Sequence, residues 1–521
     1  MAFLPCPGTG AALCFRQGLL AAFSIHPGPA RAYSALKRSP QETPVKQMFI
    51  GGRWLGAQDG RTLPVINPAN GETFDQIARG AAHEVDLAVK AARTALEGPW
   101  GRLTATERGR LLIKLGNLVL DHHAELAALE AQDTGKPMTT ARNDITVLAR
   151  YFEFYGSAAD KLHGEVIPFL NGHHVVLMRE PLGVTGHIIP WNYPAQMLGR
   201  TIAPALAAGN AVVLKPAEDT SLSALRVAEL AAEVGFPDGS INVVTGLGEE
   251  AGAALAGHPG IDFISFTGSN EVGTLVQQAA AKNAVKCVLE LGGKSPQIVF
   301  EDADIERAVP IIVRAIVQNA GQTCTAGSRL LVQQSVYDRV VEQVAAAYAK
   351  VRVGTPEMDL DCGPVMNPAQ QARVNRYIAA AKAAGIPVLA EGSVASGVSP
   401  NGHWVTPTFF GPVPRDAQLA CEEVFGPVLA AFPFKDEADA IALANGTPYG
   451  LLAAVWTENG SRQTRVAKSV KAGQLFINCY GAGGGVELPF GGTKRSGHGR
   501  EKGFLALEEM STTKTVIQYH G

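Results

Sequence analysis

An alternation of short apolar runs and helical stretches between residues 184 and 289 constrains the fold more than any other feature of this sequence. The expected strands are Val184–Ile189, Ala211–Leu214, Ile241–Val244, Phe263–Phe266 and Val285–Leu289, and the expected helices lie near 196–208, 221–234, 249–256 and 270–282. Strands joined by crossover helices lie parallel in one sheet, so the pattern predicts an α/β fold with a Rossmann-like doubly wound domain. Such a sheet binds its ligand at the carboxyl ends of its strands.

The alternation restarts after Glu290 and predicts a second α/β domain, whose first elements are expected at 297–300, 304–319, 329–333 and 336–351. Earlier in the chain we expect short strands near 49–54 and 63–68, and helices over 84–96, 106–133 and 139–161. Two β-like stretches, 164–180 and 511–519, fit neither domain and predict a protruding β ribbon. Unpaired ribbon edges would favour pairing with another subunit.

The first 47 residues differ in composition from the rest of the chain. Residues 1–41 contain no Asp or Glu but carry four Arg and Lys residues among Pro and Gly. This pattern is typical of an organellar transit segment, and it fits equally an over-extended start with the folded protein beginning near Met48. We expect residues 1–47 to be a leader or a disordered extension.

Net charge and cysteine usage limit the kind of partner and compartment. A formal net charge of −3 predicts no binding of nucleic acid or of an anionic membrane. Seven scattered cysteines, without CxxC or His/Cys metal spacing, indicate reduced thiols and no metal site. We therefore expect a cytoplasmic protein, or one of the mitochondrial matrix if residues 1–47 are a transit segment.

Cys324 and Glu290 are the strongest candidates for chemistry. Cys324 is a lone thiol in the small-residue loop Ala320–Gly327, and Glu290 is a carboxylate at the end of an expected strand. A thiol that attacks, and an acid that activates the species releasing the product, together suit covalent catalysis. The plainer alternative is a small core cysteine and a solvated strand end.

Four further segments follow expected strand ends. Asn192 lies between two prolines, where a rigid side-chain amide can donate to an oxyanion or simply form part of a turn. Lys215 and Glu218 follow the next strand, and a carboxylate there can accept both hydroxyls of a ribose. Gly246–Ala251 fits the loose GxGxxA dinucleotide pattern, and Phe266–Ser269 offers amides at a helix N-terminus for a pyrophosphate.

These segments stand in the order found in one enzyme superfamily. The motifs are Pro190-Trp191-Asn192, Lys215-Pro216-Ala217-Glu218, Phe266-Thr267-Gly268-Ser269, Leu289-Glu290-Leu291-Gly292-Gly293-Lys294, Gly321-Gln322-Thr323-Cys324, Glu423-Val424-Phe425-Gly426-Pro427, Pro489-Phe490-Gly491-Gly492 and Ser496-Gly497-His498-Gly499-Arg500-Glu501. From about Phe49 onward the chain resembles the NAD(P)-dependent aldehyde dehydrogenases. The resemblance implies an oxidoreductase with an NAD-binding domain (48–162 and 181–291), a catalytic domain (292–493) and an oligomerisation ribbon (163–180 and 508–521).

The resemblance also implies a role for each motif residue. Cys324 would attack the aldehyde, Asn192 and the Cys324 backbone N–H would hold the oxyanion, and Glu290 would activate the hydrolytic water that releases the carboxylic acid. The cofactor would be NAD, with NADP possible, because the Glu218 charge opposes a 2′-phosphate while Lys215 softens that preference. The residues implied around the cofactor are Ile189, Pro190, Trp191, Lys215, Glu218, Gly248, Gly268, Ser269, Leu291, Glu423 and Phe425.

The substrate end departs from the superfamily's pattern. Several relatives carry a Lys where this chain has Thr201, which puts in question a proton relay to Glu501. Arg200 matches an arginine with which semialdehyde-acid members bind a substrate carboxylate, but Gln318 replaces their second arginine, and a lone Arg is more often a structural ion-pair partner. The residues implied to line the substrate tunnel are Tyr193, Met197, Arg200 and Phe490.

Three functions, two of them enzymatic and one not, fit these observations. The leading one is NAD-dependent oxidation of a small-molecule aldehyde by a homodimer or homotetramer. In a CoA-acylating relative a thiol rather than water would resolve the thioester, and Glu290 would then be superfluous. In a non-catalytic scaffold or binding protein, Cys324, Asn192 and Glu290 would have no chemical purpose.

Overall fold

The computed structural model describes residues 44–481 and 485–521. Most of the predicted leader, residues 1–43, lies outside the described residues. Lys46, also assigned to that leader, pairs with the folded chain: its N–H donates to the Gln76 carbonyl at 2.7 Å, and its carbonyl accepts from the Ala78 N–H at 2.9 Å. The folded chain therefore includes residues that precede Met48.

The first sheet has eight strands, and its centre consists of the five strands predicted from the alternating pattern. These run parallel in the order β9 (Ile241–Val243), β8 (Ala211–Lys215), β7 (Val184–Ile188), β10 (Phe263–Thr267) and β11 (Lys286–Glu290). The flanking strands are β1 (Met48–Ile50), β2 (Arg53–Leu55) and β21 (Gly497–His498). Later strands lie on both sides of β7, so the doubly wound prediction is confirmed, and the switch point lies between β7 and β10.

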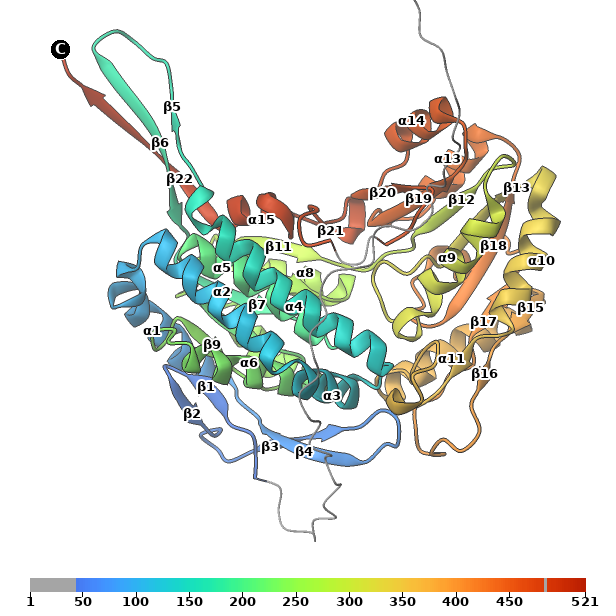
Figure 1. Ribbon diagram of the computed structural model, residues 1–521, viewed down its shortest axis with the longest axis horizontal. Helices are drawn as coiled ribbons and strands as arrows, with labels where there is room; N and C mark the ends of the chain where they lie inside the picture. Colours follow the sequence, from blue (N-terminus) through green and yellow to red (C-terminus); the bar gives the residue numbers. More distant parts are fainter. Residues whose placement is uncertain (1–43, 482–484) are drawn as a thin grey trace, which may run out of the picture. The chain divides into compact units, whose positions relative to one another are not determined.

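Crossover helices connect these strands (Figure 1). They are α5 (Pro194–Ala208), α6 (Leu222–Glu233), α7 (Ala253–Ala256) and α8 (Asn270–Ala281). The stretch predicted as one helix near 249–256 begins instead as the π-helical turn η4 (Gly248–Gly252), which continues into α7. The start of α8 is capped by Ser269, whose side-chain oxygen accepts from the Val272 N–H at 3.3 Å.

A layer of helices precedes the first parallel strand: α1 (Ala82–Glu97), α2 (Ala105–Asp121), α3 (His123–Thr134) and α4 (Met138–Ala158). The single helix predicted over 106–133 is wrong, because His122 ends α2 and starts α3 with non-helical dihedral angles (φ −96°, ψ 15°). The change of direction lets α3 pack on both α4 and α6 and bury Leu126. Packing thus outweighed a continuous helical pattern.

The second sheet has seven strands and a hydrophobic core of its own. Its order is β15 (Val388–Glu391), β17 (Thr408–Phe410), β18 (Val428–Phe434), β13 (Arg329–Gln333), β12 (Pro296–Val299), β19 (Leu452–Trp456) and β20 (Gln474–Ile477). All neighbours are parallel except β15 and β17. The accompanying helices are α9 (Ile305–Val317), α10 (Tyr337–Tyr348), α11 (Pro368–Ala383), α12 (Gln418–Cys421), α13 (Glu437–Asn445) and α14 (Gly460–Ser469).

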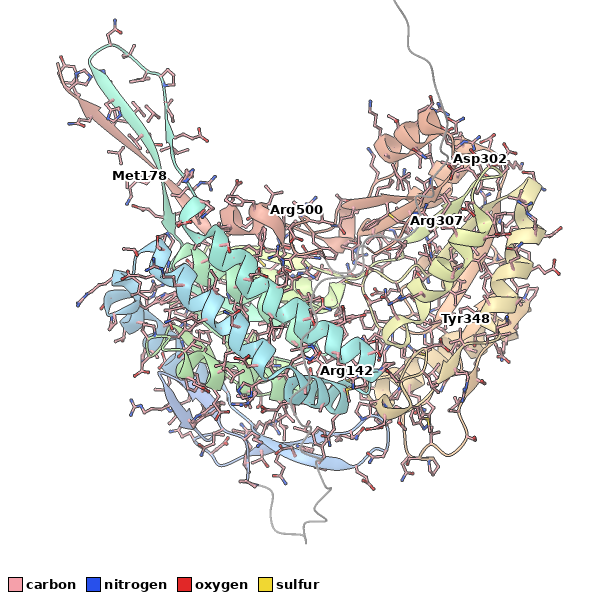
Figure 2. All side chains as sticks on the ribbon, in the orientation of Figure 1. Arg142, Met178, Asp302, Arg307, Tyr348 and Arg500 are labelled. Atoms are coloured by element: carbon pink, nitrogen blue, oxygen red, sulfur yellow. The ribbon has the colours of Figure 1, made fainter. Side chains whose placement is uncertain are left out.

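A three-stranded ribbon stands apart from both sheets (Figure 1). It consists of β5 (Glu165–Val166), β6 (His173–Pro181) and β22 (Ser511–Tyr519), which follows α15 (Gly503–Glu509). The antiparallel pairing of β6 with β22 extends from His173 opposite Tyr519 to Pro181 opposite Ser511. Met178 on β6, labelled in Figure 2, is 44% exposed and Ile517 on β22 is 62% exposed.

Two small pairings complete the fold, β3 (Thr62–Ile66) with β4 (Thr73–Ala78) and β14 (Arg352–Val353) with β16 (Ser393–Val394). Within the described ranges, no helix has both the length and the apolar character needed to cross a bilayer.

Candidate active site

The carboxyl ends of the central strands bring the predicted site segments to one edge of the first sheet. The strand register places Ile188 beside both Lys215 and Phe266, and Thr267 beside Glu290. The segments that follow these strands, including Ile189–Trp191, Gly268–Ser269 and Leu291, therefore start from the same edge. This edge includes the switch point, where open α/β sheets bind their ligands.

One side of this edge presents groups that fit a dinucleotide. The Lys215 ammonium donates to the half-buried Glu218 carboxylate at 2.7 Å, and the second carboxylate oxygen can accept a ribose hydroxyl. Ser269 is exposed at the N-terminus of α8, whose free amides favour an anion. A Cβ atom at Gly248 would meet nothing within 4 Å, so space is open at that turn.

The second domain contributes the segment Glu423–Phe425 to the same region. Glu423 Oε1 accepts from the Gly293 N–H at 2.9 Å, and burial raises the pKa of this carboxyl to about 7. Phe425 has a left-handed φ of +60°, and its ring contacts the Trp191 ring edge-to-face at 5.4 Å. This aromatic contact joins the turn after β7 to the second domain.

The loop that carries Cys324 is held in an unusual conformation. It leaves α9 through the short turn η5 (Gln318–Gly321), in which Asn319, Ala320 and Gly321 have φ values of +49°, +54° and +71°. A Cβ atom at Gly321 would lie 2.2 Å from the backbone of Gly426, so only glycine permits this approach. Backbone strain of this kind persists where the surroundings over-determine the conformation, and it is often found at functional sites.

Asn192 connects the first sheet to this loop. Its side-chain Nδ2 donates to the Gln322 carbonyl at 2.9 Å, two residues before the thiol, and its side chain is almost fully buried. In return, Asn319 Nδ2 donates to the Asn192 backbone carbonyl at 2.9 Å. One N–H of the Asn192 amide remains for an oxyanion formed at Cys324.

Glu290 is a buried carboxyl with little support from hydrogen bonds. Glu290 is 2% exposed, and among the described residues neither of its carboxylate oxygens has a hydrogen-bond partner. Burial raises the pKa of Glu290 well above its usual range; Arg200, whose Nη2 lies 3.7 Å away, opposes this rise and Glu501 adds to it. A raised pKa suits a group that must take a proton from water near neutral pH.

The pKa of the Cys324 thiol is shifted in the same direction as that of Glu290. The pKa of this thiol is raised to about 12, chiefly by burial and to a smaller extent by the Glu423 and Glu290 carboxyls, while Arg200 opposes the rise. In the protein alone, Cys324 is therefore a protonated thiol near neutral pH, and attack requires removal of its proton.

Arg200 is paired with carboxyl groups of the protein itself. Its guanidinium forms an ion pair with Glu501 and lies close to Glu290, which supports the alternative of a structural ion-pair partner. Phe490 packs under the guanidinium, with 4.3 Å between the ring centroid and Arg200 Cζ. Thr201 donates to the Met197 carbonyl at 3.0 Å, and the Glu501 carboxylate is paired with Arg200.

Sequence reasoning missed Lys136, which lies between the helices expected over 106–133 and 139–161. Its ammonium is fully buried and donates to Asp144 at 2.6 Å, Glu130 at 3.1 Å and the Asn192 carbonyl at 3.2 Å. It also lies over the Tyr193 ring, 4.6 Å from the centroid. The acidic residues at the end of α3, just before a Gly-Lys-Pro stop, were the available signal. Lys136 fixes the turn from which the Asn192 amide projects.

Comparison with known proteins gives a consistent result. The model of the "Aldehyde dehydrogenase family" matches residues 54–516. An aldehyde dehydrogenase of Emericella nidulans is 44% identical over 483 residues, which cover 91% of this chain and 96% of that protein. A solved aldehyde dehydrogenase of Burkholderia cenocepacia is 57% identical with a TM-score of 0.91, covering 91% of this chain and 100% of the other. A betaine aldehyde dehydrogenase of Staphylococcus aureus, solved with NAD+, is 36% identical with a TM-score of 0.89, covering 91% and 98%.

Removal of the Lys136 charge tests the buried cluster around Asn192. Lys136→Met should lower the free energy of unfolding by about 3–5 kcal/mol, because it leaves Asp144 and Glu130 buried without a counter-charge. Chemical denaturation measures the loss. The double variant Lys136→Met/Asp144→Asn should recover part of it, and a loss below about 1 kcal/mol would show that the cluster is not a stabilising ion pair.

The raised pKa of Cys324 predicts how fast the thiol reacts in the absence of ligands. Because the thiolate is the nucleophile, alkylation of Cys324 by iodoacetamide should rise about tenfold per pH unit from pH 7 to pH 10 without levelling off. Mass spectrometry of the Cys324 peptide follows this site separately from the other cysteines. A plateau below about pH 9 would mean that the thiol ionises more easily than its surroundings imply.

Proposed function

The chain belongs to the aldehyde dehydrogenase family, and on that premise we propose that it oxidises an aldehyde to the carboxylic acid with NAD as the hydride acceptor. The observation that carries the proposal is the Asn192 amide, held 2.9 Å from the Gln322 carbonyl and so beside the Cys324 loop. This hydrogen bond brings the proposed oxyanion donor, which follows a strand of the first sheet, next to the loop of the second domain that carries the thiol. Glu290 lies at the end of β11 in the first sheet.

In the proposed reaction Cys324 loses its proton and its sulfur bonds to the aldehyde carbon. The resulting oxyanion accepts from the Asn192 amide and the Cys324 backbone N–H. NAD, when bound, accepts the hydride from that carbon, which leaves a thioester on Cys324. Glu290 then takes a proton from water as the water attacks the thioester, and the acid leaves with return of the thiol. The balance is aldehyde, NAD+ and water to carboxylate, NADH and two protons.

The proposed cofactor site combines residues from both domains. Support comes from the Lys215–Glu218 pair, the α8 N-terminus and the Glu423–Phe425 segment, and from the Staphylococcus aureus relative solved with NAD+. The residues assigned to it are Ile189, Pro190, Trp191, Lys215, Glu218, Gly248, Gly268, Ser269, Leu291, Glu423 and Phe425. Tyr193, Met197 and Phe490 are assigned to the apolar wall of the substrate tunnel.

The position of Glu290 favours hydrolysis over transfer to coenzyme A. A buried carboxyl with a raised pKa is suited to accept a proton from water, and thiol transfer has no need of it. A non-catalytic scaffold would not require Asn192 and a strained loop to converge on a cysteine.

We also propose a homodimer or homotetramer assembled through the β5-β6-β22 ribbon. Its exposed apolar side chains, among them Phe169 at 61%, Ile517 at 62% and Tyr519 at 71% exposure, support this assignment. The cytoplasm, or the mitochondrial matrix, stays the predicted compartment.

Two variants separate the first and second halves of the proposed reaction. Cys324→Ala should lower NADH formation by more than about 10,000-fold with every aldehyde, because no thiohemiacetal can form. Glu290→Gln should form NADH in a single burst and then stall, because water is not activated. Intact-mass spectrometry should then detect the acyl group on the protein.

The results that oppose these assignments are distinct. Residual turnover by Cys324→Ala near the native rate would exclude the thiol as nucleophile. Normal steady-state turnover by Glu290→Gln, with no added mass, would remove Glu290 from the role of base. Glu233→Gln, at an exposed position near the end of α6, is the matched control for loss of a carboxylate.

The choice between NAD and NADP should depend on Glu218. Glu218→Gln should raise the ratio of kcat/KM with NADP to kcat/KM with NAD by about tenfold, because a carboxylate repels the 2′-phosphate. Steady-state kinetics with both cofactors measures the ratio. An unchanged ratio would place the adenosine ribose away from Glu218, and Glu233→Gln again serves as the control.

A further inference from the structure

Lys502 combines a strained backbone with a buried charge. It follows Glu501, has a left-handed φ of +62°, and is 8% exposed. A residue other than glycine pays about 1 kcal/mol or more for this backbone conformation, and burial of an ammonium adds to the cost. A lysine at this position therefore needs a compensating interaction.

Lys502 lies near Phe490, one of the residues proposed to line the substrate tunnel. Its Nζ lies 5.3 Å from the centroid of the Phe490 ring, the ring that also carries the Arg200 guanidinium. Phe490 and Glu501 exchange backbone hydrogen bonds of 2.7 and 2.8 Å, which hold Lys502 next to Phe490. Lys502 thus sits beside the residue proposed to line the tunnel.

Lys502 and Arg200 differ in how their charges are balanced. Arg200 pairs with Glu501 and approaches Glu290, so it has no charge to offer a ligand. Within residues 44–481 and 485–521, no carboxylate lies within ion-pair distance of Lys502. Arg200 is thus paired within the protein, and the Lys502 ammonium is left as the charge at this end of the site that a ligand can pair with.

The Lys502 charge acts both on groups of the candidate site and on a carboxylate at the surface. Burial and Arg200 lower the pKa of Lys502 to about 7, while Cys324, Glu501 and Glu290 act against that decrease. On its other side, Lys502 helps to lower the pKa of Glu487, an exposed carboxylate paired with Arg150 at 2.5 Å. A bound anion would raise the pKa of Lys502 and keep the ammonium charged.

We propose that the substrate is an aldehyde that carries a carboxylate, and that the Lys502 ammonium binds this carboxylate while Cys324 attacks the aldehyde carbon. The inference rests on the proposed aldehyde oxidation and names its substrate class. It moves the anion-binding role from Arg200, which already pairs with Glu501, to the lysine that follows the Gly499-Arg500-Glu501 segment. The carboxylate supplies the negative charge that Lys502 lacks within the protein.

Matched aldehydes test the proposal directly. The probes are 4-formylbenzoate with its methyl ester and 4-oxobutanoate with its methyl ester, which differ mainly in charge. The native protein should favour each carboxylate by at least about tenfold in kcat/KM, and Lys502→Met should reduce that preference about 10- to 100-fold, chiefly through KM. Lys502→Arg should retain it. Lys286→Met, which removes a lysine charge at the opposite end of β11, should leave it unchanged.

A binding measurement keeps the test independent of turnover and of the folding of Lys502→Met. Calorimetry with the Cys324→Ala protein should give tighter binding of benzene-1,4-dicarboxylate than of benzoate, and loss of that difference on adding Lys502→Met. Thermal unfolding of each variant checks that it is folded. If Lys502→Met does not fold, the binding preference of Cys324→Ala alone supports or refutes the anion site.

The outcomes separate the two proposals. No preference for the carboxylates in kinetics or binding overturns the role of Lys502 and leaves aldehyde oxidation intact. Equal loss for the carboxylate and its ester in Lys502→Met also overturns it, since Lys502 would then act on Cys324 rather than on the substrate. Selective dicarboxylate binding without NADH formation from any aldehyde would support the anion site and refute the proposed oxidation.

Discussion

The reciprocal hydrogen bonds between Asn192 and the Cys324 loop are the constraint on which the active site depends. Asn192 donates from its side chain to Gln322 and accepts at its backbone carbonyl from Asn319, both at 2.9 Å. The two partners belong to domains with separate hydrophobic cores. A relative shift of about 1 Å between them would part the proposed oxyanion donor from the thiol, and misplacements of this size lower catalytic rates about 100-fold. Lys136 stabilises this junction further, because its ammonium donates to the same Asn192 carbonyl.

The backbone is strained on both sides of this junction. Three successive residues before Gln322 have left-handed φ values, and Phe425 on the facing segment has another. Each such non-glycine residue costs about 1–3 kcal/mol, so the conformation needs support from neighbours. Gly321 against Gly426 supplies close backbone packing, and the Trp191–Phe425 contact links the same segment to the first sheet. The strain is thus concentrated where the two domains meet.

Charge is distributed unevenly around the thiol. Burial raises the pKa of both Cys324 and Glu290, because the low-dielectric interior disfavours two buried negative charges close together. Arg200 is shared between Glu290 and Glu501, whereas Lys502 has no such partner in the described part of the chain. Because charges interact strongly in the low dielectric of the interior, the unpaired Lys502 should attract a charged ligand more strongly than the paired Arg200 does.

Local patterns in the sequence predicted the fold class and identified the residues that are proposed to react. Continuous apolar runs require burial on both faces, so they marked β7 to β11, and glycine-rich turns after these strands marked the ligand edge. Cys324, Glu290 and Asn192 were identifiable because each stands in a distinct motif. The helix over 106–133 was predicted wrongly because the turn at His122 is decided by packing on α4 and α6, which a local pattern does not contain.

Only the tertiary structure decided how the charged residues are used. Arg200 could have met a substrate, but its partner Glu501 is about 300 residues away in the chain, and an ion pair of this separation has no signature in the sequence. Neither Lys136 nor Lys502 belongs to a site motif in the sequence, and it is the fold that places Lys136 on the Asn192 carbonyl and Lys502 beside Phe490. Residue type and spacing determined which groups can react; burial and long-range pairing, which exist only in the folded chain, determined which charges remain available to a ligand.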